Sequence, residues 1–319
     1  PTTMRTARIA AALCLVILLV ALLSFRARKQ GRVRIAYAPI LASLPVFVAQ
    51  DQQMFQQHRL QAEVVSFGSS NDMVSGLVAG QVDVLPAVSL VPLLHLEIQH
   101  PGKFRVFSHS RMRRENSTYR LVVRASSPVQ KLQDLKGKKV GVFPGTSATR
   151  LLGAFLQRNG VDPGTILFVQ LPTSAQVASL ESGAVDALFS YDPLILIAEP
   201  GRYRAISNSV YGELMEDCPV GVSVISRAYE RSQPEAAARA VGVIQEAITY
   251  VGSHPQQATA LLPQFTRMTP PMAGRVNVAD ITLSNTVDAA VLQRFIDLMY
   301  EIGEIPEKID AHRLIDATR

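Results

Sequence analysis

A repeated segment constrains the fold of this chain more than any other feature of its sequence. The segment Val64–Leu85 is matched by the segment Leu167–Leu188 at one constant offset, which aligns Gly80 with Gly183. Each copy reads as a strand, a turn that contains Ser and Thr, a short helix, a glycine and a second strand. Ser and Thr favour the N-cap of a helix, and glycine favours the left-handed residue that ends it. Two similar α/β halves predict two lobes that face each other across a binding cleft.

The segments around the repeat extend this similarity. Ile35–Pro39 is echoed by Val140–Pro144, and each of them precedes its copy of the repeat. Strands that alternate with helices predict an α/β fold with parallel-type sheets and helices on both faces. We expect one helix over Leu44–Gln56 and another that ends near Glu199. From Gln233 onward the pattern is almost wholly helical.

The chain is expected to pass between the two lobes twice. We place these passages near Leu121–Ala125 and Val220–Ile225, where the two strands would form a hinge. Residues 31–120 and 220–319 are then lobe I, and residues 121–219 are lobe II. Residues 1–30 form a separate N-terminal segment.

The N-terminal segment contains an uninterrupted apolar run, Ile9–Phe25, with basic residues on both sides. Its length is at the short end of the roughly 17–25 residues that span a bilayer. We therefore expect an uncleaved signal anchor, and a cleaved signal peptide is the alternative. The basic residues after the run favour a cytoplasmic position for the C-terminal side of the chain. The nature of the domain that follows this segment decides between the two sides of the membrane.

Composition narrows the classes of partner. The 319 residues carry a net charge of +6, which suits an anionic ligand, an acidic partner or a membrane surface. Nucleic acid is disfavoured, because Trp is absent, aromatic residues are few and no zinc-finger spacing occurs. The two cysteines, Cys14 and Cys218, do not suggest a disulfide, and we expect Cys218 to be a small buried apolar residue.

The loops after the predicted strands are the natural place for a ligand. In open α/β sheets, ligands bind beyond the carboxyl ends of the strands, where helix N-termini present free backbone N–H groups. Gly145-Thr146-Ser147 is the strongest such loop, because its hydroxyls can donate to an oxyanion, although they can equally cap the next helix. Tyr191 either stacks on a ligand or is a core aromatic residue.

Catalytic and metal sites are not indicated. Asp83 and Asp186 repeat like a catalytic pair, but each follows a glycine that ends a helix, so we favour a structural role. No histidine spacing of the metal-binding type, no phosphate-binding glycine loop and no nucleophile with an adjacent base is visible. We read the chain as a binding protein, not an enzyme, without cofactor or metal.

Several motifs together resemble a known family. Arg34–Pro39, Pro45–Ala49, Gly80–Asp83, Leu135–Gly141 and Tyr191-Asp192-Pro193 are similar, in this order, to the nitrate/sulfonate/taurine-type substrate-binding proteins of ABC importers. The resemblance covers roughly residues 33–265. It implies a two-lobed periplasmic-binding-protein fold of type II. It also implies a protein in the periplasm, at the outer face of the cytoplasmic membrane, that closes on a small solute and delivers it to an ABC permease. We expect the protein to be a monomer.

The resemblance also implies ligand contacts at four loops. Mapped onto this sequence, these contacts are Ala42, Ser43, Ser69, Ser70, Thr146, Ser147, Tyr191 and Asp192. Sulfonate, nitrate, taurine, an aromatic acid or a pyrimidine precursor would all suit such a cleft.

Two other functions stay open at this point. A membrane-anchored sensor or adaptor would use the same fold to present its ligand state to another protein. The thiamine-precursor synthases, which resemble this family, are enzymes, but their cysteine-rich motif and reactive His are not visible here.

Overall fold

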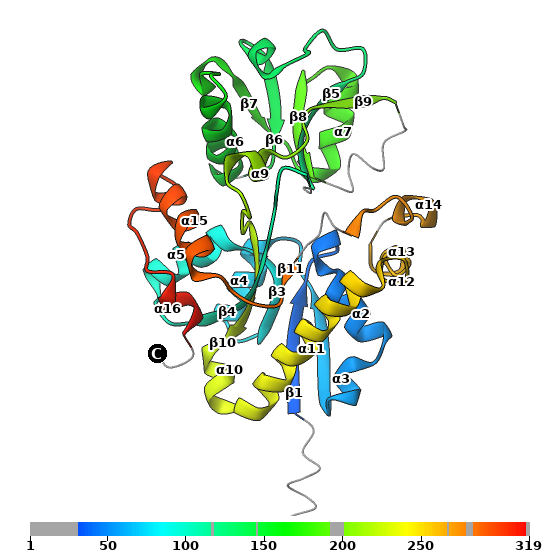
Figure 1. Ribbon diagram of the computed structural model, residues 1–319, viewed down its shortest axis with the longest axis vertical. Helices are drawn as coiled ribbons and strands as arrows, with labels where there is room; N and C mark the ends of the chain where they lie inside the picture. The colour runs from blue at the N-terminus through cyan, green and yellow to red at the C-terminus, as the bar shows by residue number, and fades with distance from the viewer. Residues whose placement is uncertain are drawn as a thin grey trace, which may run out of the picture.

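The structure is a computed structural model, and it describes residues 31–115, 118–144, 146–191, 201–266, 268–278 and 283–316. Two sheets, drawn one above the other in Figure 1, organise this part of the chain. The first sheet contains β1 (Gly31–Tyr37), β2 (Leu60–Ser66), β3 (Val84–Ser89), β4 (Phe104–Ser110), β10 (Gly221–Ser226) and β11 (Leu283–Ser284). The second contains β5 (Tyr119–Arg124), β6 (Lys139–Val142), β7 (Leu167–Gln170), β8 (Ala187–Tyr191) and β9 (Tyr203–Ser207).

Helices cover the faces of both sheets (Figure 1). Those that follow strands of the first sheet are α2 (Leu44–Asp51), α3 (Met54–Gln57), α4 (Ser70–Val78) and α5 (Leu90–Gln99). Those of the second are α6 (Thr146–Arg158), α7 (Thr173–Ser182) and α9 (Val210–Leu214). The C-terminal part contains α10 (Arg227–Ser232), α11 (Pro234–Ser253), α12 (Pro255–Thr259), α13 (Leu262–Phe265), α14 (Pro270–Ala273), α15 (Ala289–Glu301) and α16 (His312–Ile315).

The two sheets have equivalent topology. Their strand orders are β2-β1-β3-β10-β4-β11 and β7-β6-β8-β5-β9, so each pairs its third strand with an antiparallel strand that follows a passage between the sheets. β4 is antiparallel to β10, and β9 to β5, so both run parallel to the first three strands of their own sheet. The chain leaves β4 and β9 at their carboxyl ends to reach the other sheet. The carboxyl ends of the parallel strands in one sheet therefore point toward those in the other.

The repeated residues serve this topology. Gly80 and Gly183 end their helices at φ +66° and +79°, the left-handed region expected for them. In the first copy, Asp83 Oδ2 accepts a hydrogen bond from the backbone N–H of Arg34 at 2.8 Å. In the second, Asp186 Oδ2 accepts from that of Lys139 at 2.9 Å. Each Asp thus ties the start of its lobe's third strand to the first strand, which is the structural role preferred from sequence.

Some local expectations were wrong. The helix expected over Leu44–Gln56 is two helices, α2 and α3, because Gln53 adopts a left-handed φ of +54° between them. The helix α7 has Pro172 at its N-cap, with no side-chain cap, where the repeat predicted Ser or Thr. The helix expected to end near Glu199 lies outside the described residues.

The passages between the sheets also differ from expectation. Leu121–Ala125 and Val220–Ile225 lie largely inside β5 and β10, where they are paired on both sides. The first crossing lies between β4 and β5 and its described part is residues 111–115 and 118, and the second crossing is residues 215–220. A short antiparallel bridge between Met112 and Cys218 joins them. Sequence periodicity marks a strand well, but it does not show where the strand leaves its sheet.

Three buried clusters stabilise the described part of the chain, and two of them are large. One packs β1 and α2 against the apolar stripe of α11, which includes Ala240, Val243, Ile244 and Ala247. The other is continuous between the two sheets, and it combines buried residues of α4, α5 and α15 with those of β5, β6, α6 and α9. Figure 1 shows α15 beside α5 and below α6 and α9. Helix α15 therefore takes part in the contact between the two halves.

Within the described residues, no helix combines the length and the apolar character needed to cross a membrane. The run Ile9–Phe25 lies outside those residues, so the signal anchor stays a prediction.

Candidate functional site

The candidate site lies where the carboxyl ends of the two sets of parallel strands face each other. Helices that begin there are α2, α4 and α5 on the side of the first sheet, and α6 and α7 on the side of the second. The first N–H groups of a helix have no partner within the helix, so these ends favour an anion. The residues selected from sequence can now be placed on these ends.

On the first strand's loop, Ala42 is half-buried and Ser43 is fully buried. Ser43 occupies the N-cap of α2, but its side chain makes no capping hydrogen bond. Its Oγ has no hydrogen-bond partner among the described residues. A buried hydroxyl without a partner is uncommon in proteins.

The next loop holds Ser69 and Ser70, and both have structural partners. Ser69 Oγ accepts from the backbone N–H of Asp72 at 3.2 Å and donates to the Asp72 carboxylate at 2.7 Å. Ser69 is therefore the N-cap of α4, as its residue type predicts. Ser70 Oγ accepts from the backbone N–H of Ser89 at 3.1 Å, which ties α4 to the end of β3.

On the second sheet, α6 begins at Thr146, and Ser147 is its second residue. The side chain of Thr146 and all of Asp192 lie outside the described part of the chain. Tyr191 is half-buried and ends β8, directly opposite Tyr119 of β5.

An aromatic cluster surrounds Tyr191. Its ring lies 5.1 Å from that of Phe143, which follows the end of β6, and 6.0 Å from that of Tyr119. Tyr119 in turn lies 4.6 Å from Tyr211, and burial raises the pKa of Tyr211 well above its ordinary value. Tyr191 and Phe143 are thus the half-buried outer members of an aromatic core, and a contact of Tyr191 with a ligand stays a prediction.

Sequence reasoning missed a polar cluster at the start of α6. Ser147 Oγ donates to Glu304 Oε1 at 2.5 Å, although Glu304 follows α15 on the side of the first sheet. Arg150 Nη1 lies 3.6 Å from Glu304 Oε2, and His95 Nε2 lies 3.7 Å from Glu304 Oε1. The partners are remote in sequence, and no local pattern indicates the contact.

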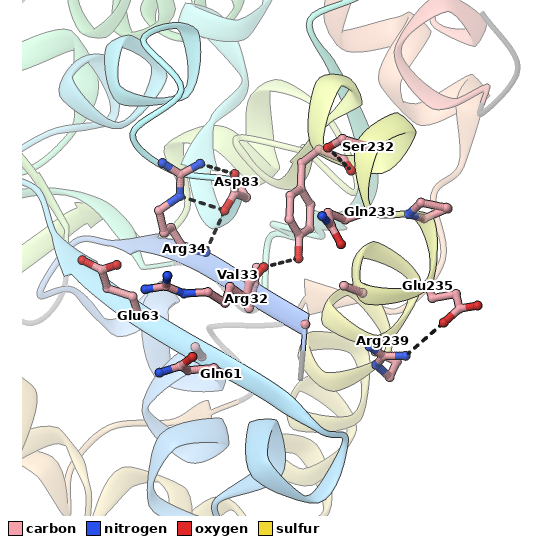
Figure 2. A pocket seen from close by; sticks show the side chains of 15 residues that line it. Arg32, Val33, Arg34, Gln61, Glu63, Asp83, Ser232, Gln233, Glu235 and Arg239 are labelled. Atoms are coloured by element: carbon pink, nitrogen blue, oxygen red, sulfur yellow. Dashed lines mark hydrogen bonds and ion pairs between the residues drawn. The ribbon is translucent and has the colours of Figure 1, made fainter. Parts of the chain in front are cut away.

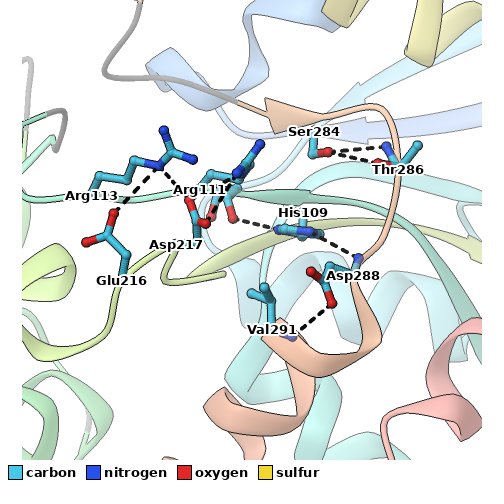
Figure 3. Close-up of polar contacts among 10 residues, drawn as sticks. His109, Arg111, Arg113, Glu216, Asp217, Ser284, Thr286, Asp288 and Val291 are labelled. Carbon is cyan, nitrogen blue, oxygen red and sulfur yellow. Dashed lines mark hydrogen bonds and ion pairs between the residues drawn. The ribbon is translucent and has the colours of Figure 1, made fainter.

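The two crossings are joined by ion pairs (Figure 3). Asp217, in the second crossing, accepts from Arg111 Nε at 3.2 Å and from Arg113 Nε at 2.6 Å, both in the first crossing. The hydrogen bond from Arg113 lowers the pKa of Asp217, against an opposing effect of burial. Asp217 also has a left-handed φ of +55°. The two crossings are therefore held together as one unit beside the site.

Close backbone packing reinforces this unit. Ser209 Oγ donates to the carbonyl oxygen of Arg113 at 2.5 Å. A Cβ at Gly212 of α9 would lie 2.2 Å from the carbonyl carbon of Arg113, so only glycine fits there.

His109, at the end of β4, connects the crossings to the C-terminal segment. Its Nδ1 lies 2.8 Å from the carbonyl oxygen of Ser110, and its Nε2 lies 3.3 Å from the backbone nitrogen of Asp288 (Figure 3). A carbonyl oxygen only accepts and an N–H only donates, so this arrangement fits a neutral ring protonated at Nδ1. Burial lowers the pKa of His109.

A separate groove, of about 1120 Å³, lies at the amino ends of β1 and β2. It is lined by Gly31–Arg34, Gln61–Glu63, Asp83 and part of α10 and α11. Figure 2 shows Arg34 turned toward Asp83, and Arg239 toward Glu235. None of the ligand contacts predicted from sequence lines this groove. It lies at the end of the strands that does not bind ligands in open α/β sheets.

The described residues contain no group of three or more His, Cys, Asp or Glu that could hold a metal ion. Cys218 is fully buried and unbridged, as predicted, and burial raises the pKa of its thiol, which keeps it protonated. The arrangement can bind a small polar solute through hydroxyls, helix N-termini and aromatic rings.

Two sheets with facing strand ends and paired crossings define a two-lobed binding protein. The family comparison agrees, because residues 26–262 match the NMT1-like family. The chain belongs to that family, and the resemblance to nitrate- and sulfonate-binding proteins inferred from sequence is confirmed.

Solved structures with the same fold include three binding proteins. The periplasmic aliphatic sulphonate binding protein SsuA from Escherichia coli has a TM-score of 0.75 at 22% identity, over 89% of this chain and 97% of that one. The alkanesulfonate-binding protein SsuA from Xanthomonas axonopodis pv. citri, bound to MOPS, has a TM-score of 0.72 at 20% identity, over 90% and 98%. The periplasmic nitrate-binding protein NrtA from Synechocystis has a TM-score of 0.68 at 14% identity, over 89% and 84%. These similarities establish the periplasmic-binding-protein fold.

Proposed function

We propose that this protein is an extracytoplasmic solute-binding protein that captures a small anionic solute between its two lobes and delivers it to an ABC permease. The observation that carries the proposal is the facing of the strand carboxyl ends in a chain of the NMT1-like family. The net charge of +6 favours an anion electrostatically. The binding of sulfonate or nitrate by proteins of the same fold makes those anions the first candidates.

The proposed contacts come from both lobes. Ser43 and Ser70 would line the first lobe, and the start of α6, with Thr146 and Ser147, would supply hydroxyl and backbone donors from the second. Tyr191 would cover the apolar part of the solute. Ala42, Ser69 and Asp192 complete the set proposed from sequence, although the hydroxyl of Ser69 already caps α4.

The proposal includes where the protein acts and how it is divided. Lobe I comprises residues 31–120 and 220–319, and lobe II comprises residues 121–219. We place the protein at the outer face of the cytoplasmic membrane, held by the apolar run Ile9–Phe25. It would act as a monomer that meets its permease there, and it would bind without catalysing a reaction.

The test is a screen of thermal stability on the full chain, unfolded and refolded to remove any carried-over solute. Sulfonates, nitrate, carboxylates and pyrimidines are compared over a range of concentrations. A true ligand at a hundredfold excess over its Kd stabilises the folded state by about 2.7 kcal/mol. We expect one class to raise the melting temperature, and Tyr191→Ala to reduce that rise. Chemical turnover of any ligand, or no shift with any class, would contradict the proposal.

A further inference from the structure

Glu304 is a buried acid whose backbone position is fixed by the motif that ends α15. It follows Gly303, whose φ of +72° ends α15, and the backbone N–H of Glu304 donates to the carbonyl oxygen of Met299 at 2.8 Å. Together with the bond from Gly303 N–H to the Tyr300 carbonyl, this is a Schellman motif. The residue after the glycine in that motif is frequently apolar. Here it is a carboxylate with only 6% of the residue exposed.

The partners of this carboxylate are those that an anionic solute would need. Ser147, the second residue of α6, donates from its Oγ to Glu304 Oε1 at 2.5 Å. Arg150 lies one turn further along the same helix, with its Nη1 3.6 Å from Glu304 Oε2. His95 of α5 approaches from the first lobe at 3.7 Å. The start of α6 also carries the positive end of the helix dipole, which attracts a negative charge.

A single hydroxyl proton cannot serve two acceptors. While Ser147 donates to Glu304, its hydroxyl can only accept from a solute, because a hydroxyl has one donor. A solute anion at the start of α6 would also lie close to a like charge. Glu304 therefore opposes the solute at the loop that sequence analysis rated strongest.

We propose that Glu304 is a built-in competitor for the anionic solute, which sets the affinity of the site. This inference rests on the proposed function, and it concerns a residue beyond the family match at residues 26–262. In the arrangement described here the Glu304 carboxylate accepts the hydroxyl proton of Ser147 at the start of α6. The solute must displace it from Ser147, and α6 is then released from the C-terminal segment.

The experiment compares the full chain with Glu304→Gln by calorimetric titration. The probes are ethanesulfonate and nitrate, with ethyl methyl sulfone as an uncharged relative of the first. Removing a like charge beside the solute is expected to tighten binding of the anions on the order of tenfold, which is about 1.4 kcal/mol. Binding of the uncharged sulfone should not tighten to the same extent.

Three further variants make the result specific. Glu301→Gln removes an exposed acid from the same segment, and it should leave the affinity unchanged. Glu304→Asp keeps the charge but shortens the side chain away from Ser147, so it should tighten binding less than Glu304→Gln does. Ser147→Ala removes a donor to the solute, and it should weaken binding. Melting curves without solute verify that each variant folds.

The outcomes separate the two proposals. If the unsubstituted chain binds the anions and Glu304→Gln binds them equally well or more weakly, the competitor is overturned. The proposed function would then still stand. If Glu301→Gln also tightens binding of the anions, the effect of Glu304→Gln is explained by the net charge of the protein. That result would also overturn the competitor. No binding of either anion by any of the proteins would overturn the competitor and would remove sulfonate and nitrate as the first candidates for the solute, while the proposed function would still be tested by the other classes of the thermal screen.

Discussion

The repeat offers an internal control on how Asp83 stabilises its lobe. We compare Asp83→Ala with Asp186→Ala, because the two residues occupy equivalent positions but differ in their partners. Asp83 also accepts from the guanidinium of Arg34, with Nη2 at 2.6 Å and Nε at 3.0 Å. Among the described residues, the side chain of Asp186 accepts only the hydrogen bond from the Lys139 backbone, and this bond is exposed.

The magnitudes follow from burial. In Asp83→Ala the part-buried N–H of Arg34 loses its acceptor, at a cost of about 1–3 kcal/mol. The guanidinium is 40% exposed, so loss of the ion pair adds at most about 1 kcal/mol. We expect Asp83→Ala to lower the free energy of unfolding by about 3 kcal/mol. In Asp186→Ala water can replace the lost acceptor, and the expected loss is about 1 kcal/mol.

Urea unfolding of the full chain, followed by circular dichroism, measures both values. Arg34→Gln separates the two contributions, because it retains the backbone hydrogen bond and removes the ion pair. It should cost at most about 1 kcal/mol. An equal loss in Asp83→Ala and Asp186→Ala would refute the reasoning, as would a loss in Arg34→Gln as large as in Asp83→Ala.

Three other expectations concern the crossings. Gly212→Ala should destabilise the protein by about 1–3 kcal/mol through overpacking. Gly242→Ala, with open space around it in α11, should stabilise it by about 0.5–1 kcal/mol. Equal effects of the two substitutions in urea unfolding would contradict this expectation. Because burial lowers the pKa of His109, the unfolded chain takes up a proton first, so stability should fall as pH decreases below about 6.5. His109→Gln should flatten that slope, and His100→Gln, at an exposed position, should leave it unchanged. The buried Cys218 thiol should react with iodoacetamide only after unfolding, and peptide mapping of the native protein would reveal any earlier reaction.

Much of the fold could be predicted because its signals are local and occur twice. Gly80 and Gly183 mark the ends of two helices, and the Asp three residues after each glycine starts a third strand. These features depend on backbone conformation and on hydrogen bonds within one lobe. The two-lobed α/β fold follows from finding them in both halves of the chain.

The features that could not be predicted depend on contacts between distant segments or on one atypical residue. Gln53 breaks a helix with a left-handed conformation that its residue type does not favour. The crossings are defined by the pairing of Met112 with Cys218, which strand periodicity cannot reveal. Glu304 approaches Ser147 only because α15 lies between the two halves of the molecule. The loops of the candidate site could therefore be selected from the sequence, but the contact of Glu304 with Ser147 could not.

Hydrogen–deuterium exchange tests the central claim most directly, which is that the solute lies between the two sets of strand carboxyl ends. The full chain is compared with and without millimolar concentrations of each anion in the thermal screen. We predict simultaneous protection of residues 38–43 and 67–71 in the first lobe and of residues 143–150 in the second. Protection of one lobe alone, or of the groove around Gly31–Arg34 and Arg239, would contradict the account.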